Sequence, residues 1–192
     1  MDAPLLYRQL MDQLSQWVNA KDVRHLQGVS EAVGAILQSQ EACPALWLPY
    51  LSHRDCSARA HLERIQYLLE NPQICAARFY YPLLQKVLSA FAGSSLTLAF
   101  DTSMLWNEYC LVEVSLIWGG RSLTVVQTVL EHPSASVAFE DYQSVLEQAY
   151  AQIPPGCTVT LLADRGFDHK QLLQWLNDHQ REWGIRLKCD VS

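Results

Sequence analysis

The chain has 192 residues, of which 49% are hydrophobic and 18% are charged. This composition excludes a disordered chain and allows one large domain or two small ones. The sequence contains no run of eighteen apolar residues, and its N-terminus lacks the basic start and apolar stretch of a signal peptide. We therefore expect a cytoplasmic protein with no membrane span.

The charge is divided unevenly along the chain. Residues 1–90 hold eight basic and eight acidic residues, whereas residues 91–192 hold six basic and twelve acidic residues, which accounts for the net charge of −6. A DNA-binding domain is usually basic, so this balance weighs against DNA as a partner unless divalent metal ions contribute to phosphate binding. The six cysteines show no CxxC pair or metal-ligand spacing, which favours reduced thiols over disulfides or a zinc site.

The first part of the chain, residues 1–92, has helical periodicity throughout. Apolar residues recur at spacings of three and four, and Ser57 is suited to cap the third helix. Pro82 lies inside the fourth helix, which must be kinked there or consist of two short pieces. The sequence predicts an all-helical N-terminal region, with DNA binding as a candidate role, and its helices are 5–17, 23–38, 57–69 and 74–91.

The second part, residues 93–192, changes to the period of strands. Gly119 and Gly120 separate two runs rich in β-branched and aromatic residues, a strong signal for a tight hairpin. We expect an α+β or α/β domain with a mixed sheet, in which three antiparallel strands are followed by a helix, a parallel strand, a helix and a last strand. The expected strands are 96–100, 109–118, 121–130, 158–163 and 184–189, and the expected helices are 138–153 and 168–179.

Two aspartates carry the candidate chemistry. Asp101 and Asp164 each follow a short buried strand, so parallel neighbouring strands would bring both carboxylates to one edge of the sheet. Such a pair is stabilised by a cation, and its hard oxygen ligands suit Mg²⁺ or Mn²⁺. A two-metal site of this kind performs in-line phosphoryl transfer. The alternative for either residue alone is an aspartate that caps the following turn.

The sequence around both aspartates resembles motifs of a known family. LTLAFDTSML and VTLLADRGFDHKQLLQWLNDHQREWGIRLK are similar to the first and second motifs of DDE transposases of the insertion-sequence-four group, and LWLPYLSHRDCSARAHLERIQYLLENPQI is similar to the stretch before their catalytic core. The resemblance implies a ribonuclease H-like catalytic domain that performs DNA transposition by metal-dependent strand cleavage and transfer. It makes Asp101 and Asp164 the first and second catalytic, metal-binding acids. Arg165 and Lys188 become candidate contacts to the DNA backbone.

The same resemblance implies a third acid, a glutamate within a Tyr-Arg-Glu-Lys signature, which this sequence does not contain. Glu182 lies before the last expected strand, where we expect an exposed residue at a helix end. We therefore expect a transposase truncated before its third acid and catalytically incomplete. We also expect exposed apolar surface on one face of its sheet.

Two other functions remain open from the sequence. A non-catalytic chain could bind transposon ends, or pair with a second copy or with full-length transposase, and inhibit transposition. A phosphatase of the haloacid dehalogenase type also places an aspartate after a strand. That type requires a second acid where this chain has Ser103, and a helix where this chain has a hairpin. Scattered tryptophans such as Trp106 and Trp118 suit packing better than base stacking.

Overall fold

The computed structural model describes residues 3–51 and 56–186. The chain forms two compact units, Met1–Lys86 and Val87–Ser192, and each is considered by itself. Within the described ranges, no helix is both long enough and apolar enough to cross a membrane.

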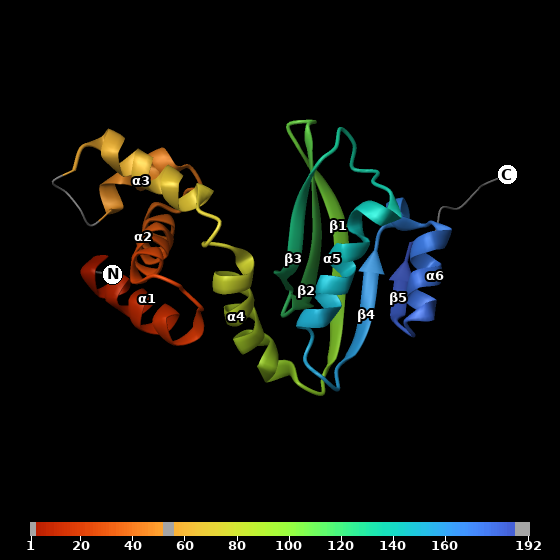
Figure 1. The fold of residues 1–192 in the computed structure, drawn as a ribbon. Helices are drawn as coiled ribbons and strands as arrows, with labels where there is room; N and C mark the ends of the chain where they lie inside the picture. Colours follow the sequence, from red (N-terminus) through yellow and green to blue (C-terminus); the bar gives the residue numbers. More distant parts are fainter. Residues whose placement is uncertain (1–2, 52–55, 187–192) are drawn as a thin grey trace. The chain divides into compact units, whose positions relative to one another are not determined.

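The regular elements described in the first unit are all helices (Figure 1). Its elements are α1 (Ala3–Trp17), α2 (Val23–Ser39), a 3-10 helix (Pro44–Tyr50), α3 (Ala58–Glu70) and α4 (Ala76–Leu88), the last of which ends in the second unit. The side chains of Asp22 and Ser57 cap α2 and α3 by accepting backbone N–H groups of Arg24 and Ala60. Pro82 lies inside α4, which continues through it as one helix.

Two small clusters of buried side chains hold these helices together. Leu14, Leu26 and Phe79 form one cluster across α1, α2 and α4. The other joins α2 and α3 to the 3-10 helix, and its members are Ala35, Trp47, Leu51 and Ile65. The apolar positions that repeat at helical spacing along the sequence therefore face these cores.

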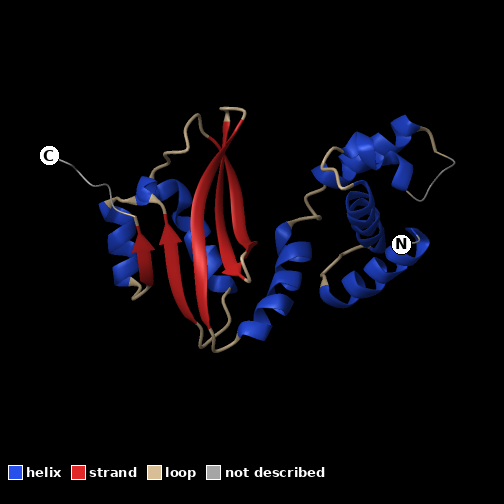
Figure 2. Ribbon diagram, turned by 180° about the vertical axis from the view of Figure 1, so that it is seen from behind, coloured by secondary structure: helices blue, strands red, loops and turns tan. Residues whose placement is uncertain are grey.

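The second unit is an α+β fold built on a mixed five-stranded sheet (Figure 2). Its strands are β1 (Ser95–Leu105), β2 (Tyr109–Trp118), β3 (Arg121–Glu131), β4 (Thr158–Ala163) and β5 (Glu182–Ile185). They lie in the order β3-β2-β1-β4-β5. The first three pair antiparallel, whereas β4 pairs parallel with both β1 and β5.

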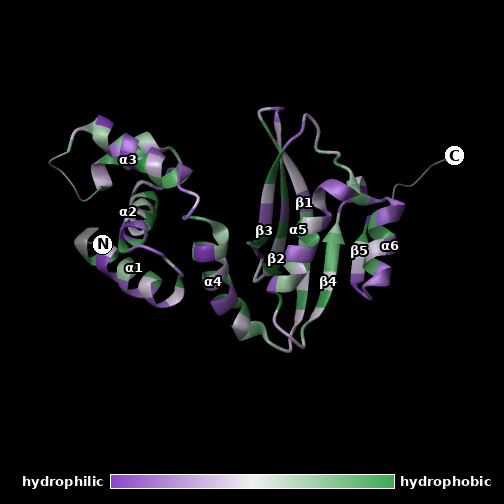
Figure 3. Ribbon diagram, in the orientation of Figure 1, coloured by the Kyte–Doolittle hydropathy of each residue, from purple (hydrophilic) through white to green (hydrophobic). Residues whose placement is uncertain are grey.

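Two helices, α5 (Phe139–Gln152) and α6 (Lys170–Asp178), pack on the same face of this sheet. The buried ring of Phe100 on β1 contacts Tyr142 of α5, and Phe139 of α5 contacts Trp175 of α6. Figure 2, seen from behind, shows the strands in front of both helices. Along β1 the buried residues alternate with more exposed ones, because successive side chains point to opposite faces. Figure 3 shows the apolar character of β4, which lies between β1 and β5.

Several expectations for the sheet are confirmed and two are wrong. Gly119 and Gly120 have positive φ angles of 57° and 73° in the β2–β3 turn, as the hairpin prediction required. The first strand does not end at Asp101: β1 continues to Leu105, because β2 keeps pairing with it. The last strand begins at Glu182, two residues earlier than expected, and residues 187–189 of the expected strand lie outside the described residues.

Candidate functional site

The sheet register brings Asp101 and Asp164 together. The parallel pairing of β1 with β4 ends at Phe100 opposite Ala163, and each aspartate is the next residue of its strand. The two aspartates therefore leave the paired part of the sheet at neighbouring positions, Asp101 within β1 and Asp164 as the residue directly after β4. Because Phe100 faces α5, the alternation of a strand directs Asp101 to the opposite face, where it is exposed.

Both carboxylates also have a local structural role. Asp101 Oδ1 accepts the backbone N–H of Thr102 at 2.8 Å. Asp164 Oδ1 accepts the backbone N–H of Gly166 at 2.7 Å and caps the short 3-10 helix Arg165–Phe167. Each aspartate therefore has one oxygen engaged by the backbone, which fixes its orientation, while Oδ2 can serve as a ligand.

Aromatic packing behind the sheet anchors the two motif segments. The ring of Phe100, directly before Asp101, lies 4.4 Å from the ring of Phe167, three residues after Asp164, measured between centroids. Phe167 in turn contacts Tyr142, whose hydroxyl is hydrogen-bonded to Nε2 of His169. Thr102 is held as well, since its hydroxyl donates to the backbone oxygen of Ala135 at 2.9 Å.

Two charged residues flank the aspartates in the same row of the sheet, and neither was singled out from the sequence. Glu113 of β2 lies directly opposite Asp101, and Arg186 follows Ile185, the β5 partner of Ala163, which places it beside Asp164. A carboxylate oxygen of Glu113 accepts hydrogen bonds from Ser115 and, at 2.8 Å, from Thr124, so this side chain is turned toward β3. Glu113 faces Asp101 through the β1–β2 register, which the turn at Trp106 and Asn107 sets, and this turn carries no strong signal in the sequence.

The other expected residues have varied positions. Arg165 is exposed next to Asp164, in the 3-10 helix. Lys188 lies outside the described residues. Glu182 is not at a helix end: it begins β5 and accepts a hydrogen bond from the hydroxyl of Thr160 at 3.0 Å.

The donor set of the aspartate pair fits a divalent ion. Carboxylate oxygens are the ligands that Mg²⁺ and Mn²⁺ prefer, and both aspartates are exposed on the face that α5 and α6 leave open. Among the residues that the structure describes, no group of three or more His, Cys, Asp or Glu side chains is arranged to hold a metal ion. The candidate site is therefore a pair of ligands, to which water and substrate oxygens would have to be added.

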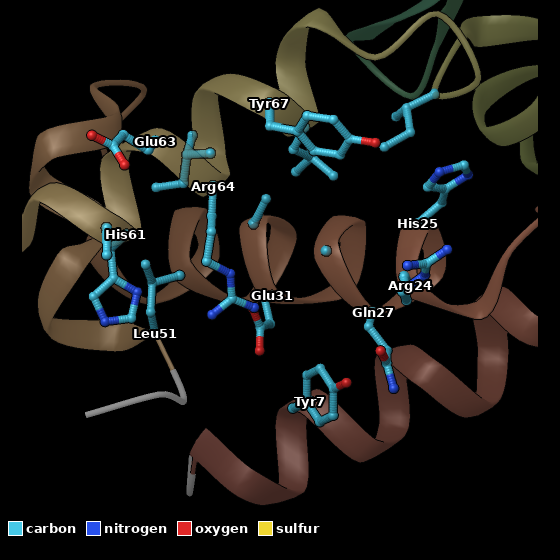
Figure 4. Close-up of a pocket in the computed structure, with 16 residues that line it drawn as sticks. Tyr7, Arg24, His25, Gln27, Glu31, Leu51, His61, Glu63, Arg64 and Tyr67 are labelled. Carbon is cyan, nitrogen blue, oxygen red and sulfur yellow. The ribbon is translucent and has the colours of Figure 1, made fainter. Parts of the chain in front are cut away.

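The helical unit contains a separate pocket of about 790 Å³ (Figure 4). Arg64 and Glu31 form an ion pair of 3.8 Å within its lining, and burial together with Glu31 raises the pKa of Tyr7. Arg24, also in the lining, is paired with Asp22 at 2.6 Å. Arg24 and Arg64 of this lining are thus each paired with an acidic side chain.

Comparison of the sequence with protein-family models and with curated proteins found no match in either case.

Proposed function

We propose that this chain is part of a DDE transposase, in which Asp101 and Asp164 are the first and second metal-binding acids of a ribonuclease H-like domain. The observation that carries the proposal is the register of β1 and β4, which brings these two aspartates together on one face of the sheet. The sequence motifs around both residues support the same assignment. The substrate would be DNA at the ends of a transposable element.

The chemistry follows from the ligands. Bound Mg²⁺ or Mn²⁺ ions would supply activation of a water or 3′-hydroxyl and stabilisation of the leaving oxygen in an in-line displacement at phosphorus. Asp101 and Asp164 hold the ions, and their backbone hydrogen bonds to Thr102 and Gly166 keep the carboxylates oriented before an ion arrives. Exposed Arg165 and Arg186 lie beside Asp164, where they can contact phosphate oxygens.

The third acid of the family has no counterpart in these 192 residues. We therefore expect binding of metal and DNA from the pair alone, and strand cleavage only where a further carboxylate joins it. Glu113 is the nearest candidate by register, although its hydrogen bonds now turn it toward Thr124.

The test uses a labelled duplex that carries the terminal repeats of the parent element, with Mn²⁺, Mg²⁺ or EDTA. We expect metal-dependent DNA binding by the native chain and its loss in Asp101→Asn and Asp164→Asn. Asp178→Asn, at the exposed end of α6, is the control, because it removes the same charge away from the pair. Cleavage lost in Asp101→Asn would extend the proposal to catalysis, and a native chain that shows no metal-dependent binding contradicts it.

A non-catalytic inhibitor of transposition is the second candidate. The observation that favours it is apolar surface on the face of the sheet that carries Asp101: Ile117, Val129 and Leu162 are 40%, 53% and 42% exposed. Such surface suits pairing with a second copy or with full-length transposase. DNA binding that is indifferent to metal and to Asp101→Asn, together with self-association, would favour this candidate over the first.

The structure gives no support to the phosphatase alternative. A haloacid dehalogenase-type site requires a second acid two residues after the first and a helix soon afterwards. Here Ser103 occupies that position, and β1 turns directly into β2.

A further inference from the structure

The turn between β1 and β2 contains an unusual residue. Trp106 is 84% exposed, the highest value among the large hydrophobic side chains of the described residues. It also has a positive φ angle of 52°, and Asn107 after it has one of 58°. The backbone N–H of Glu108 donates to Leu105 O at 3.2 Å, which closes the turn. Positive φ at both central residues with this hydrogen bond is the pattern of a type I′ turn.

Tryptophan is an unfavourable choice here for two independent reasons. Asn and Gly suit the left-handed region of such a turn, and Asn107 fits it, but a bulky residue with positive φ is strained. An indole that is 84% exposed also forgoes most of the burial that usually stabilises a tryptophan. Residues that combine backbone strain with exposure cluster at binding sites, because the strain is retained for function and not for stability.

The position of the turn relates Trp106 to the aspartate pair. β1 and β4 run in the same direction, so the turn lies beyond the end of the sheet at which Asp164 follows β4 (Figure 1). Trp106 is five residues beyond Asp101 along β1, a distance of about 16 Å. At the rise of about 3.4 Å per nucleotide along the axis of duplex DNA, this span corresponds to about four or five base pairs.

The charges around Trp106 indicate whether this side chain would contact the phosphates or the bases of a nucleic acid. The sequence contains no Lys or Arg between Asp101 and Gly120, whereas Glu108 lies in the turn itself and Glu131 pairs with Tyr109 next to it. An acidic turn repels phosphate groups, so the contact that this turn offers to a nucleic acid is the ring face of the indole. A base offers its own ring face only where the stack of the duplex is open.

We propose that Trp106 stacks on an unpaired or frayed base of the DNA strand held at Asp101 and Asp164. This inference rests on the proposed function and adds to it a second contact, to a base, at the end of the β1–β2 hairpin. Trp106 is a positioning residue: it fixes the strand relative to the aspartate pair and does not touch the reacting phosphate.

The experiment measures binding of fluorescently labelled single-stranded and overhang-bearing oligonucleotides by anisotropy, in the presence of Mn²⁺. The principal variant is Trp106→Asn, because asparagine suits positive φ and keeps the hairpin. We expect its affinity to fall about 5- to 100-fold, in line with the loss of one stacked base. Trp106→Phe should recover part of this loss, and the melting temperature of Trp106→Asn should be no lower than that of the native chain.

Trp118→Asn is the matched control, since Trp118 is 67% exposed near the β2–β3 turn, at the other end of the hairpin strands. We expect it to leave the affinity unchanged. Oligonucleotides with single abasic positions should show one position at which the difference between native and Trp106→Asn disappears.

Three results would overturn the proposal. The first is that the native chain and Trp106→Asn bind the oligonucleotides with equal affinity. The second is a loss of affinity in Trp106→Asn that is just as large in Trp106→Phe. The third is a native chain that binds none of the oligonucleotides. A change in self-association with unchanged DNA affinity would likewise overturn it, and would point to a protein partner. Failure of the proposed metal site is detected separately, by Mn²⁺ titration of native chain and Asp101→Asn, in which Trp106 takes no part.

Discussion

The rings of Phe100 and Phe167 lie 4.4 Å apart, and this contact joins the two segments that carry the candidate metal ligands. Phe100 precedes Asp101 by one residue, and Phe167 follows Asp164 by three. Both rings are almost fully buried behind the sheet, while the aspartates face the other way. The separation of the two carboxylates is therefore set by packing in the core as well as by the strand register.

Removal of this contact should affect both stability and the site. We expect Phe167→Ala to lower the free energy of unfolding by about 3–5 kcal/mol, as for other buried phenylalanines, and to weaken Mn²⁺ binding. Leu172→Ala on α6 is the control, because Leu172 is fully buried but is not part of this ring contact. Denaturant unfolding and Mn²⁺ titration should show a stability loss in both variants and a loss of affinity only in the first.

The capping role of Asp164 can be separated from its role as a ligand. Asn can accept the N–H of Gly166 as Asp does, whereas Ala cannot. We expect Asp164→Ala to cost about 1 kcal/mol of stability and Asp164→Asn much less, with both variants losing Mn²⁺ binding. Equal stability of the two variants would show that the cap contributes nothing.

Two tyrosines of α5 provide a matched pair for hydrogen bonding. The hydroxyl of Tyr142 is bonded to His169, whereas the hydroxyl of Tyr150 is buried with no hydrogen-bond partner among the described residues. We expect Tyr142→Phe to cost about 1–2 kcal/mol, and Tyr150→Phe to be neutral or stabilising by up to about 1 kcal/mol. The guanidinium of Arg181 lies 4.3 Å from the ring centroid of Tyr150, and a phenylalanine ring preserves this contact.

The same tyrosines predict the response to alkaline pH. Burial raises the pKa of Tyr150 to about 12 and raises that of Tyr142 further, from an ordinary value near 10. A group whose pKa is higher in the folded state favours folding below its unfolded pKa and loses that contribution as the pH rises. We expect the ionisation of both tyrosines to leave the free energy of unfolding unchanged below about pH 10. Between about pH 10 and 12 this free energy should fall. Tyr150→Phe should make this fall shallower.

Much of the second unit follows from local sequence signals. The paired glycines specify the β2–β3 hairpin, and the helix between residues 138 and 153 requires a crossover that makes β4 parallel to its neighbour. If β1 and β4 were parallel neighbours, Asp101 and Asp164 were expected at one edge of the sheet, and the two strands are indeed parallel neighbours. Their chemical role stays a prediction.

Other features depend on pairing that no local signal reveals. β1 extends past Asp101 because β2 supplies hydrogen-bond partners as far as Leu105, although the residues from Thr102 to Leu105 have no strict apolar alternation. Glu113 and Arg186 reach the row of the aspartates through register alone. The strained φ of Trp106 is likewise invisible in the sequence, where Asn107 is the only turn-favouring residue of the segment.

The most direct test of the central claim is binding of Mn²⁺ to the native chain, followed by isothermal titration calorimetry and by electron paramagnetic resonance. The account predicts a site that is lost in both Asp101→Asn and Asp164→Asn and is retained in Asp178→Asn. Absence of Mn²⁺ binding to the native chain, or binding that survives Asp101→Asn and Asp164→Asn together, would contradict it.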